Sequence, residues 1–312
     1  MQALVVQSSG EVEVNEVPDP EPGPGQVLVE TEVAGAGFVD VMLRRGQYAG
    51  SAAGMVPGVE VVGRVRAAGA DVPADLVGQR VLAQPSLGGY AELVAVDAGR
   101  VLPLPEDTDA ASAVALGVNA LVAEVSLSRA GVRNGTRVLV RGASGGVGLL
   151  ATQVAAARGA EVTAVTSSAE RADRLRALGA TTVVDRTTAT VSGGPYDVVV
   201  DPVAGPDMPS FLELLDANGH YVACGAAAGT PPDAFFHALL AAFFRSPTLM
   251  AFSLSSVTQD ELRASWREIT TLWAKGALEP VVDERLPLAE AEKALVALEA
   301  GTPFGKVVLT CG

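Results

Sequence analysis

A dense run of glycines marks where this chain could bind a nucleotide. Four glycines lie within Gly142–Gly148, directly after the short apolar run Val138–Val140. An alanine-rich stretch follows as far as Arg158, and a second β-like run extends from Val162 to Val165. The order strand, glycine turn, helix, strand predicts one βαβ unit of about 30 residues.

Glycines in such a turn suit the binding of a pyrophosphate. They let the backbone turn sharply, and they let an anion approach bare N–H groups at the positive end of a helix dipole. Gly148 would allow the helix to pack close to the strand. A ligand-free turn is the alternative, but four glycines in seven residues cost backbone entropy that a plain turn need not incur. We therefore expect cofactor contacts from Ser144, Gly145, Gly146 and Val147.

The end of the second strand discriminates between nucleotides. An NAD site usually places Asp or Glu there, to accept hydrogen bonds from the ribose 2′-hydroxyl. This chain has Ser167, Ser168 and Arg171 instead, and hydroxyls with a guanidinium suit a 2′-phosphate. The sequence therefore favours NADP(H). Alternatively, Ser168 caps the next helix and Arg171 is a solvated surface charge, and Glu170 could repel a phosphate.

Length and charge narrow the class of protein. The chain has 312 residues, a formal net charge of −14 and 49% hydrophobic residues. That length accommodates two domains, and the acidic balance argues against nucleic acid as a partner. Two cysteines cannot supply a disulfide framework, and no signal peptide or membrane span is expected. We expect a cytoplasmic enzyme.

The order of predicted elements gives an α/β fold of two domains. Short strands and turns dominate residues 1–115, and a short helix is expected over 38–45. Strands then alternate with helices through residues 116–255, as in a doubly wound parallel sheet. Residues 256–312 return to the first domain. We expect a Rossmann NADP(H)-binding domain, inserted into a β-rich catalytic domain.

Taken together, these motifs resemble the medium-chain dehydrogenase/reductase superfamily, in its zinc-independent quinone oxidoreductase branch. The resemblance covers nearly the whole chain and rests on five segments in order: GFVDVMLRRGQY (Gly37–Tyr48), PGVEVVGRV (Pro57–Val65), GGYAE (Gly88–Glu92), RGASGGVG (Arg141–Gly148) and Leu286–Leu309. It implies a GroES-like catalytic domain, a Rossmann domain, hydride transfer from NADPH and, usually, a homodimer.

Zinc is not expected. A catalytic zinc takes about three protein ligands from Cys, His and carboxylate side chains. Zinc-dependent relatives have a Cys near the position of Gly37 and a Gly-His-Glu where this chain has Gly58-Val59-Glu60. Neither the Cys nor the His is present. His220 and His237 lie outside the N-terminal catalytic part.

The active-site segment departs from its relatives in two places. The usual Asn is Gly37, and a tyrosine frequent in bacterial relatives is Met42. The resemblance implies a more apolar pocket, with Gly37, Phe38 and Met42 at the substrate. Tyr48 could donate to a developing oxyanion, and Asp40 is expected to orient the segment. Packing roles for these side chains remain open.

The resemblance also places residues near the nicotinamide. The loop beginning at Gly225 and Ala226 would pass there, as would the segment around Phe252. Asn119 stands where the branch often has a Thr beside the cofactor. Lys306 could reach the cofactor, or it could be an ordinary surface lysine.

We expect NADPH-dependent reduction of a quinone or of an activated C=C bond. Two alternatives remain open: a pathway-specific enoyl reductase acting on a biosynthetic intermediate, and an NADPH-binding protein with little catalysis. The segment Thr248–Leu254 could pair with a second copy of the chain, because an exposed apolar strand edge needs covering.

Overall fold

The computed structural model describes residues 1–48 and 51–311. The chain forms two compact units: unit 1 comprises Met1–Val118 with Pro280–Gly312, and unit 2 comprises Asn119–Glu279. Unit 2 is therefore an insertion in unit 1. The expected boundaries at 115/116 and 255/256 differ most at the second junction.

Helix α7 accounts for that difference. It spans Gln259–Ala274 and follows the last strand of unit 2. Glu261 accepts two hydrogen bonds from Arg129 of the same unit, and Gln153 exchanges two with the backbone of Glu279. The alternation of strands and helices therefore ends later than the sequence pattern indicates.

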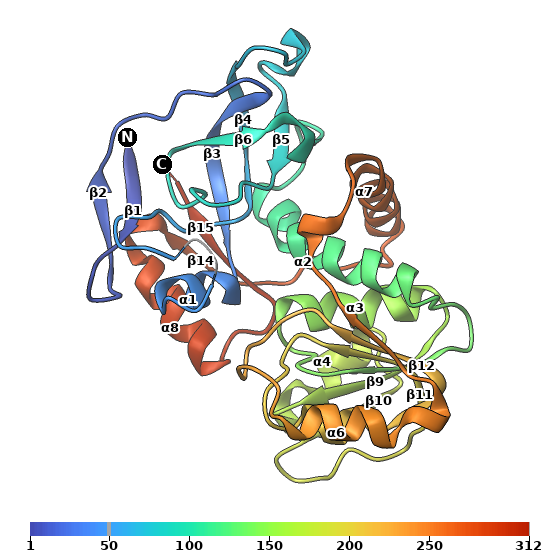
Figure 1. The fold of residues 1–312 in the computed structure, drawn as a ribbon. Helices are drawn as coiled ribbons and strands as arrows, with labels where there is room; N and C mark the ends of the chain where they lie inside the picture. Colours follow the sequence, from blue (N-terminus) through green and yellow to red (C-terminus); the bar gives the residue numbers. More distant parts are fainter. Residues whose placement is uncertain (49–50, 312) are drawn as a thin grey trace. The chain divides into compact units, whose positions relative to one another are not determined.

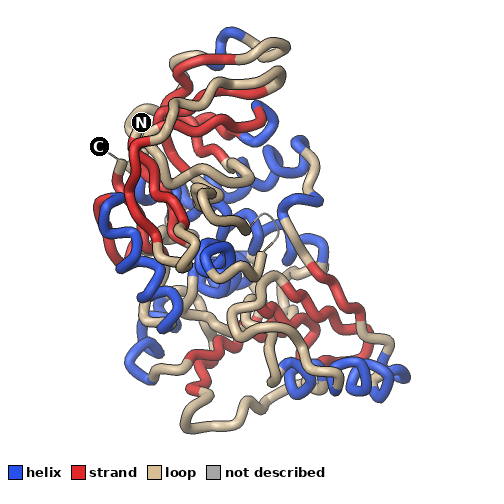
Figure 2. The backbone as a smooth tube through the Cα atoms, turned by 60° about the vertical axis from the view of Figure 1, so that its left-hand side comes forward, coloured by secondary structure: helices blue, strands red, loops and turns tan. Residues whose placement is uncertain are grey.

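Unit 1 is mostly strand and loop (Figure 2). Its main sheet has seven strands in the order β14-β15-β3-β4-β5-β7, with β6 paired to β3, and a separate pair is formed by β1 and β2. The strands are β1 (Gln2–Val6), β2 (Val12–Glu16), β3 (Gln26–Ala36), β4 (Val61–Ala68), β5 (Arg80–Ala83), β6 (Leu93–Asp97), β7 (Val101–Pro103), β14 (Val282–Pro287) and β15 (Lys306–Thr310). Valines dominate the buried core of this unit, as expected for strands.

Two helices in unit 1 frame its active-site segment. Helix α1 spans Phe38–Arg44 and packs against α8, which spans Ala291–Ala300. Arg44 lies in the last turn of α1, where a cation interacts favourably with the helix dipole. It also forms ion pairs of 2.6 and 2.9 Å with Glu292 and Glu299. The 3-10 turns of this unit are η1 (Ala74–Leu76), η2 (Ala98–Arg100) and η6 (Leu288–Glu290).

Unit 2 is built on a parallel sheet of six strands. Their order is β10-β9-β8-β11-β12-β13, so the direction of winding reverses between β8 and β11. Ligands of such sheets bind at the carboxyl ends of the strands, at this reversal. The strands are β8 (Arg137–Val140), β9 (Glu161–Thr166), β10 (Thr182–Asp185), β11 (Tyr196–Asp201), β12 (Leu215–Ala223) and β13 (Thr248–Ala251).

Helices cover both faces of this sheet, with α3 on one face and α6 on the other (Figure 1). Leu139, Val199 and Tyr221 project from neighbouring strands into one core with residues of α5 and α6. Such continuous burial is typical of parallel strands. The helices are α3 (Gly146–Ala157), α4 (Ala172–Ala177), α5 (Met208–Leu212) and α6 (Ala234–Ala241), with 3-10 turns η3 (Ala169–Arg171), η4 (Phe243–Arg245) and η5 (Leu254–Ser256).

Helix α2 (Ala110–Arg129) joins the two units and is kinked. Gly117 has φ 19° and ψ −129°, a conformation outside the helical region. By length and composition α2 could cross a membrane, but 78% of its apolar window is buried inside the protein. Its hydropathy is therefore that of a core helix.

Candidate functional site

The turn between β8 and α3 has the close backbone packing that its glycines predict. Gly142 has a φ of +56°, in the left-handed region, and Gly145 is the N-cap of α3. A Cβ on Gly148 would lie 2.3 Å from the carbonyl oxygen of Gly142. Only glycine therefore lets the first turn of α3 approach the end of β8 so closely.

Asn119 lies directly against this turn. It is buried, and a Cβ on Gly146 would lie 2.3 Å from its Nδ2 atom. The structure thus brings together two residues that the sequence predicts at the cofactor. The N–H groups of the first turn, from Gly146 and Val147, have no acceptor four residues earlier in the helix and suit an anion.

The end of β9 carries hydroxyl groups, as expected. Ser144 is buried, and its hydroxyl lies 2.9 Å from that of Thr166, the last residue of β9. Ser167 is exposed, and Ser168 begins the 3-10 turn η3, in which Arg171 is the last residue. The Ser168 side chain makes no capping hydrogen bond, so the capping alternative for this residue is not what the structure shows.

A carboxylate on the neighbouring strand lies close to the start of η3. Asp185 ends β10, and hydrogen bonds from the hydroxyl and N–H of Thr187 lower the pKa of its carboxyl group, with help from the N–H of Ala169. Sequence reasoning missed this contact, because it joins the ends of two strands.

A buried ion pair lies next to the cofactor turn. Arg141 Nη1 is 2.7 Å from Oδ2 of Asp201, the last residue of β11. The guanidinium carbon of Arg141 is 4.0 Å from the ring centre of Phe211. The Tyr221 hydroxyl donates to the same carboxylate. Burial, and then Asp201, raises the pKa of Tyr221. Sequence reasoning missed this cluster; the only signal was the Asp that closes the apolar run YDVVVD.

The loop after β12 runs beside the β11 carboxyl end. A Cβ on Gly225 would lie 2.5 Å from the carbonyl oxygen of Pro202, so this glycine is required by close backbone approach. Ala226 is half-buried. Burial raises the pKa of the Cys224 thiol to about 12, which makes it an inert neutral thiol at pH 7. Phe252 is buried, with the Arg129 guanidinium 5.4 Å from its ring centre.

In unit 1, Asp40 is a fully buried anchor. Its Oδ2 accepts hydrogen bonds from the N–H of Gly37 (3.0 Å) and the hydroxyl of Tyr90 (2.8 Å), and its Oδ1 accepts one from the N–H of Gly58 (2.9 Å). Burial raises the pKa of Asp40, against the lowering effect of these hydrogen bonds. This geometry favours the orienting role, since both carboxylate oxygens already accept hydrogen bonds from the protein.

A second buried pair lies beside it. Lys306 is 3% exposed and donates to Oε1 of Glu60, while Glu60 Oε2 accepts the N–H of Val118 at 2.8 Å. The alternative that Lys306 is a surface lysine is therefore wrong. Cβ atoms on Gly35 and Gly117 would come within 2.7 and 2.3 Å of the Glu60 carboxylate, so both glycines make room for it.

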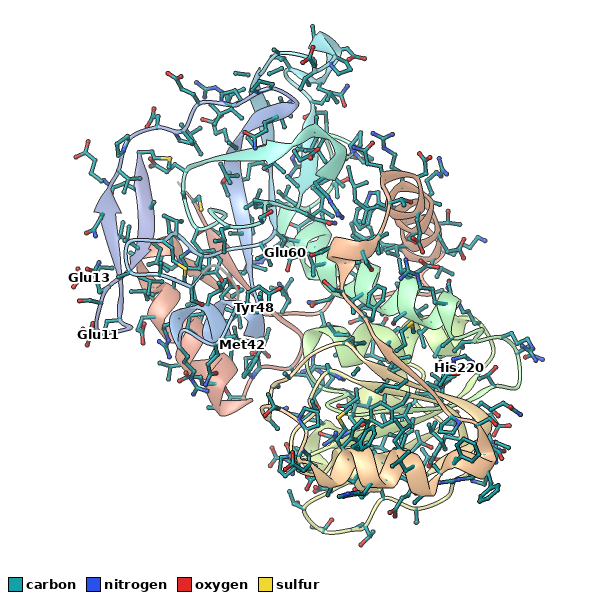
Figure 3. All side chains as sticks on the ribbon, viewed as in Figure 1. Glu11, Glu13, Met42, Tyr48, Glu60 and His220 are labelled. Carbon is teal, nitrogen blue, oxygen red and sulfur yellow. The ribbon has the colours of Figure 1, made fainter. Side chains whose placement is uncertain are left out.

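The remaining predicted substrate residues lie along α1. Gly37 precedes the helix, and Phe38 and Met42 are half-buried. Tyr48 follows the helix and is 44% exposed. Figure 3 shows Met42 and Tyr48 around α1 and Glu60 elsewhere in the same unit.

Within residues 1–48 and 51–311, no group of three or more His, Cys, Asp or Glu side chains could hold a metal ion. Two buried carboxylates of unit 1 already have partners: Asp40 accepts three hydrogen bonds and Glu60 pairs with Lys306.

Two family models match the chain. A model described as the alcohol dehydrogenase GroES-like domain matches residues 23–106, and one described as zinc-binding dehydrogenase matches residues 178–309. The first lies in unit 1, and the second covers parts of both units.

Known proteins are similar over more than nine-tenths of the chain, and solved structures over all of it. A quinone oxidoreductase of Pseudomonas aeruginosa is 30% identical over 93% of this chain and 92% of its own length. The quinone oxidoreductase of Thermus thermophilus, solved also in complex with NADPH, is 33% identical with a TM-score of 0.83, covering 100% of both chains. A polyketide synthase protein of Streptomyces orinoci is 34% identical over 92% of this chain, which spans 13% of that protein.

The order of the six strands, the glycine turn and these full-length similarities lead to one assignment. This chain belongs to the medium-chain dehydrogenase/reductase superfamily, in its quinone oxidoreductase branch.

Proposed function

We propose that this protein is an NADPH-dependent oxidoreductase that delivers hydride to a quinone or to an activated C=C bond, without zinc. The observation that carries the proposal is the β8–α3 turn, where a Cβ on Gly148 would meet the backbone of Gly142 and one on Gly146 would displace the Asn119 side chain. A turn packed this closely leaves backbone N–H groups bare at a helix N-terminus, which suits a pyrophosphate.

The described residues suit two phosphate groups of NADPH, the pyrophosphate and the 2′-phosphate. Gly145, Gly146 and Val147 would hold the pyrophosphate, and Ser167, Ser168 and Arg171 would hold the 2′-phosphate. When bound, the nicotinamide supplies the hydride. Buried Asn119 and Ser144 keep the turn in shape, and the Arg141–Asp201 pair lies next to it.

Zinc independence rests on the donor set. Three ligands from Cys, His and carboxylate are needed for a catalytic zinc, and Asp40 and Glu60 already have hydrogen-bond partners. Activity that survives chelation with EDTA, in protein that elemental analysis shows to be free of zinc, would support zinc independence. Activity lost on chelation and restored by zinc would refute it.

The proposal that the substrate is a quinone or an enone rests on similarity to proteins named quinone oxidoreductase. An oxyanion forms on a quinone or enone as hydride arrives, and without a metal it needs hydrogen-bond donors. Tyr48, at the exposed end of the segment, is one candidate. Water suffices to protonate the hydroquinone anion that hydride addition leaves.

A second candidate is reduction of a C=C bond in a pathway-specific acyl intermediate. The 34% identity to a segment of a polyketide synthase favours it. Both candidates use the same cofactor site and hydride step, and they differ in the substrate that the pocket accepts.

Oxidation of NADPH, followed with benzoquinone, cyclohexenone and a crotonyl thioester, separates the candidates. Turnover of benzoquinone or cyclohexenone supports the first, and selective turnover of the thioester supports the second. Tight NADPH binding without turnover on any of them would indicate an NADPH-binding protein with little catalysis and would contradict both. A homodimer and a cytoplasmic location are further parts of the proposal.

A further inference from the structure

The glycine at position 37 is not required by the backbone. Gly37 has φ −134° and ψ 163°, an extended conformation that any residue adopts. A Cβ there would lie 3.7 Å from both Asp40 Oδ2 and Val39 Cγ1, and 3.9 Å from Lys306 Nζ, all ordinary contact distances. Gly35, by contrast, has no room for a Cβ.

Helix capping does not explain the glycine either. Gly37 is the N-cap of α1, where Asn, Asp and Ser side chains stabilise a helix better than glycine does. Glycine therefore leaves a volume open at this half-buried position, and the neighbours of that volume indicate what it could hold.

The open volume borders a buried cation. Lys306 Nζ carries three N–H donors, and within residues 1–48 and 51–311 it donates to Glu60 Oε1. The two nearby carboxylates are already engaged: Asp40 Oδ2 accepts from Gly37 and Tyr90, and Glu60 also accepts from Val118. The ammonium is thus the group with donors left for a ligand.

Distance allows a direct contact from this volume to the ammonium. An oxygen atom about 1 Å closer to Lys306 Nζ than the Cβ position would be at hydrogen-bond distance.

We propose that the volume left by Gly37 is the subsite for the carbonyl oxygen of the substrate, and that Lys306 Nζ donates the hydrogen bond to it. The inference rests on the proposed function and deepens it. It assigns substrates whose carbonyl oxygen is unhindered, namely quinones and enones, and makes Lys306 a catalytic residue.

The chemistry balances with groups already named. Hydride adds to the electrophilic carbon, the C=C electron pair shifts toward the carbonyl, and negative charge develops on its oxygen. A cation held in a buried site stabilises that charge more than water does. Lys306 keeps its proton in this role, and water protonates the product.

Removing both charges tests the role of Lys306 without stranding a buried ion. Lys306→Met alone would leave Glu60 buried and unpaired, which destabilises proteins. The double variant Lys306→Met/Glu60→Gln is neutral and keeps an acceptor for the N–H of Val118. The matched control is Lys293→Met/Glu284→Gln, an exposed ion pair in the same unit.

A binding signature is measured first, without turnover. Carbon-13-labelled cyclohexanone binds to the protein loaded with NADP⁺, and infrared difference spectroscopy records its carbonyl stretch. We expect a shift to lower frequency in the wild-type protein and in the control, and its loss in the Lys306→Met/Glu60→Gln variant.

Kinetics supply the second readout. We expect kcat with cyclohexenone to fall at least about tenfold in the Lys306→Met/Glu60→Gln variant, with NADPH affinity within about twofold of wild type. Gly37→Ala fills the volume with a methyl group at ordinary contact distance from Lys306 Nζ and leaves both charges of the Lys306–Glu60 pair in place. It should therefore lower kcat/KM by about tenfold and abolish the carbonyl shift.

The failures can be told apart. An unchanged carbonyl band in both the Gly37→Ala and the neutral variant, in a protein that still reduces cyclohexenone, overturns this inference alone. Absence of turnover in the wild-type protein on every quinone and enone overturns the proposed function instead.

Discussion

Arg171 is the residue on which the choice of cofactor depends. It ends the 3-10 turn η3, next to the hydroxyls at the end of β9. A guanidinium binds a phosphate by charge-assisted hydrogen bonds, so Arg171→Ala should raise the Kd of NADPH by about tenfold or more. The Kd of NADH should stay within about twofold.

Titration calorimetry with both nucleotides checks this prediction. Arg176→Ala is the matched control, because Arg176 lies on the following helix and pairs with Asp173 on the surface. Equal losses for NADPH and NADH in Arg171→Ala would refute the assignment of the 2′-phosphate.

The burial of Asp40 should make the stability of the protein depend on pH. Burial raises its pKa above the ordinary 3.8, so the native protein keeps this proton at pH values where the unfolded chain has lost it. The contribution of Asp40 to the free energy of unfolding therefore falls as pH rises from about 4 toward the folded pKa, by at most about 1.4 kcal/mol per pH unit.

Denaturant unfolding of wild type and Asp40→Asn at several pH values measures this effect as a difference. Asp185→Asn provides the contrast, because hydrogen bonds from Thr187 lower the pKa of Asp185 and its contribution is lost as pH falls. A wild-type minus Asp40→Asn difference that does not change with pH would show that Asp40 is ionised in the native state as readily as in the unfolded chain.

At the scale of elements, the β8–α3 turn tests which glycines are indispensable. A Cβ on Gly148 meets the backbone oxygen of Gly142, whereas one on Gly146 meets the end of the Asn119 side chain. Backbone cannot yield as a side chain can, so Gly148→Ala should cost about 1–3 kcal/mol of stability and Gly146→Ala clearly less.

Thermal unfolding of the two variants, with and without NADPH, checks this ranking. Gly146→Ala should still fold but should gain less stability from NADPH than wild type does, because Asn119 is pushed from its place. If the two variants were equally stable, α3 would have to shift as a unit, and the close approach would not be required.

Sequence patterns predicted an element well where residues close together in the chain determine its structure. The β8–α3–β9 unit and α1 follow from apolar runs, glycines and helix signals that lie within a few residues. Two features could not be predicted in this way. The kink at Gly117 depends on the contact of Glu60 with Val118, and the assignment of α7 to unit 2 depends on the contact of Arg129 with Glu261. Those partners are 58 and 132 residues apart.

The candidate site divides in the same way. The cofactor turn could be predicted because its chemistry lies in consecutive backbone groups. The pairs Lys306–Glu60 and Arg141–Asp201 could not, because 246 and 60 residues separate their partners. From sequence alone, Lys306 could reach the cofactor or be a surface lysine. Its burial in the structure excludes the second alternative.

At the scale of the whole molecule, several exposed large apolar side chains lie close together in the sequence of unit 2. Strand β13 is an edge strand of the unit 2 sheet, and large exposed apolar side chains gather on the elements that precede it and on the strand itself. They are Phe236, Leu240, Phe243, Phe244 and Leu249, of which Phe244 is 96% exposed. An uncovered apolar edge of this kind favours pairing with another strand.

We therefore predict a homodimer joined through β13 and α6. Two copies of β13 would pair across the interface, and the phenylalanines would be buried between the partners. Phe244→Glu combined with Phe236→Glu should place charges in that interface and yield monomers in analytical ultracentrifugation. Val296→Glu, a control that also places a charge at an exposed apolar residue but in unit 1, should leave the dimer intact. A wild-type protein that sediments as a monomer at micromolar concentration would contradict the prediction, and the exposed phenylalanines would then need a different partner.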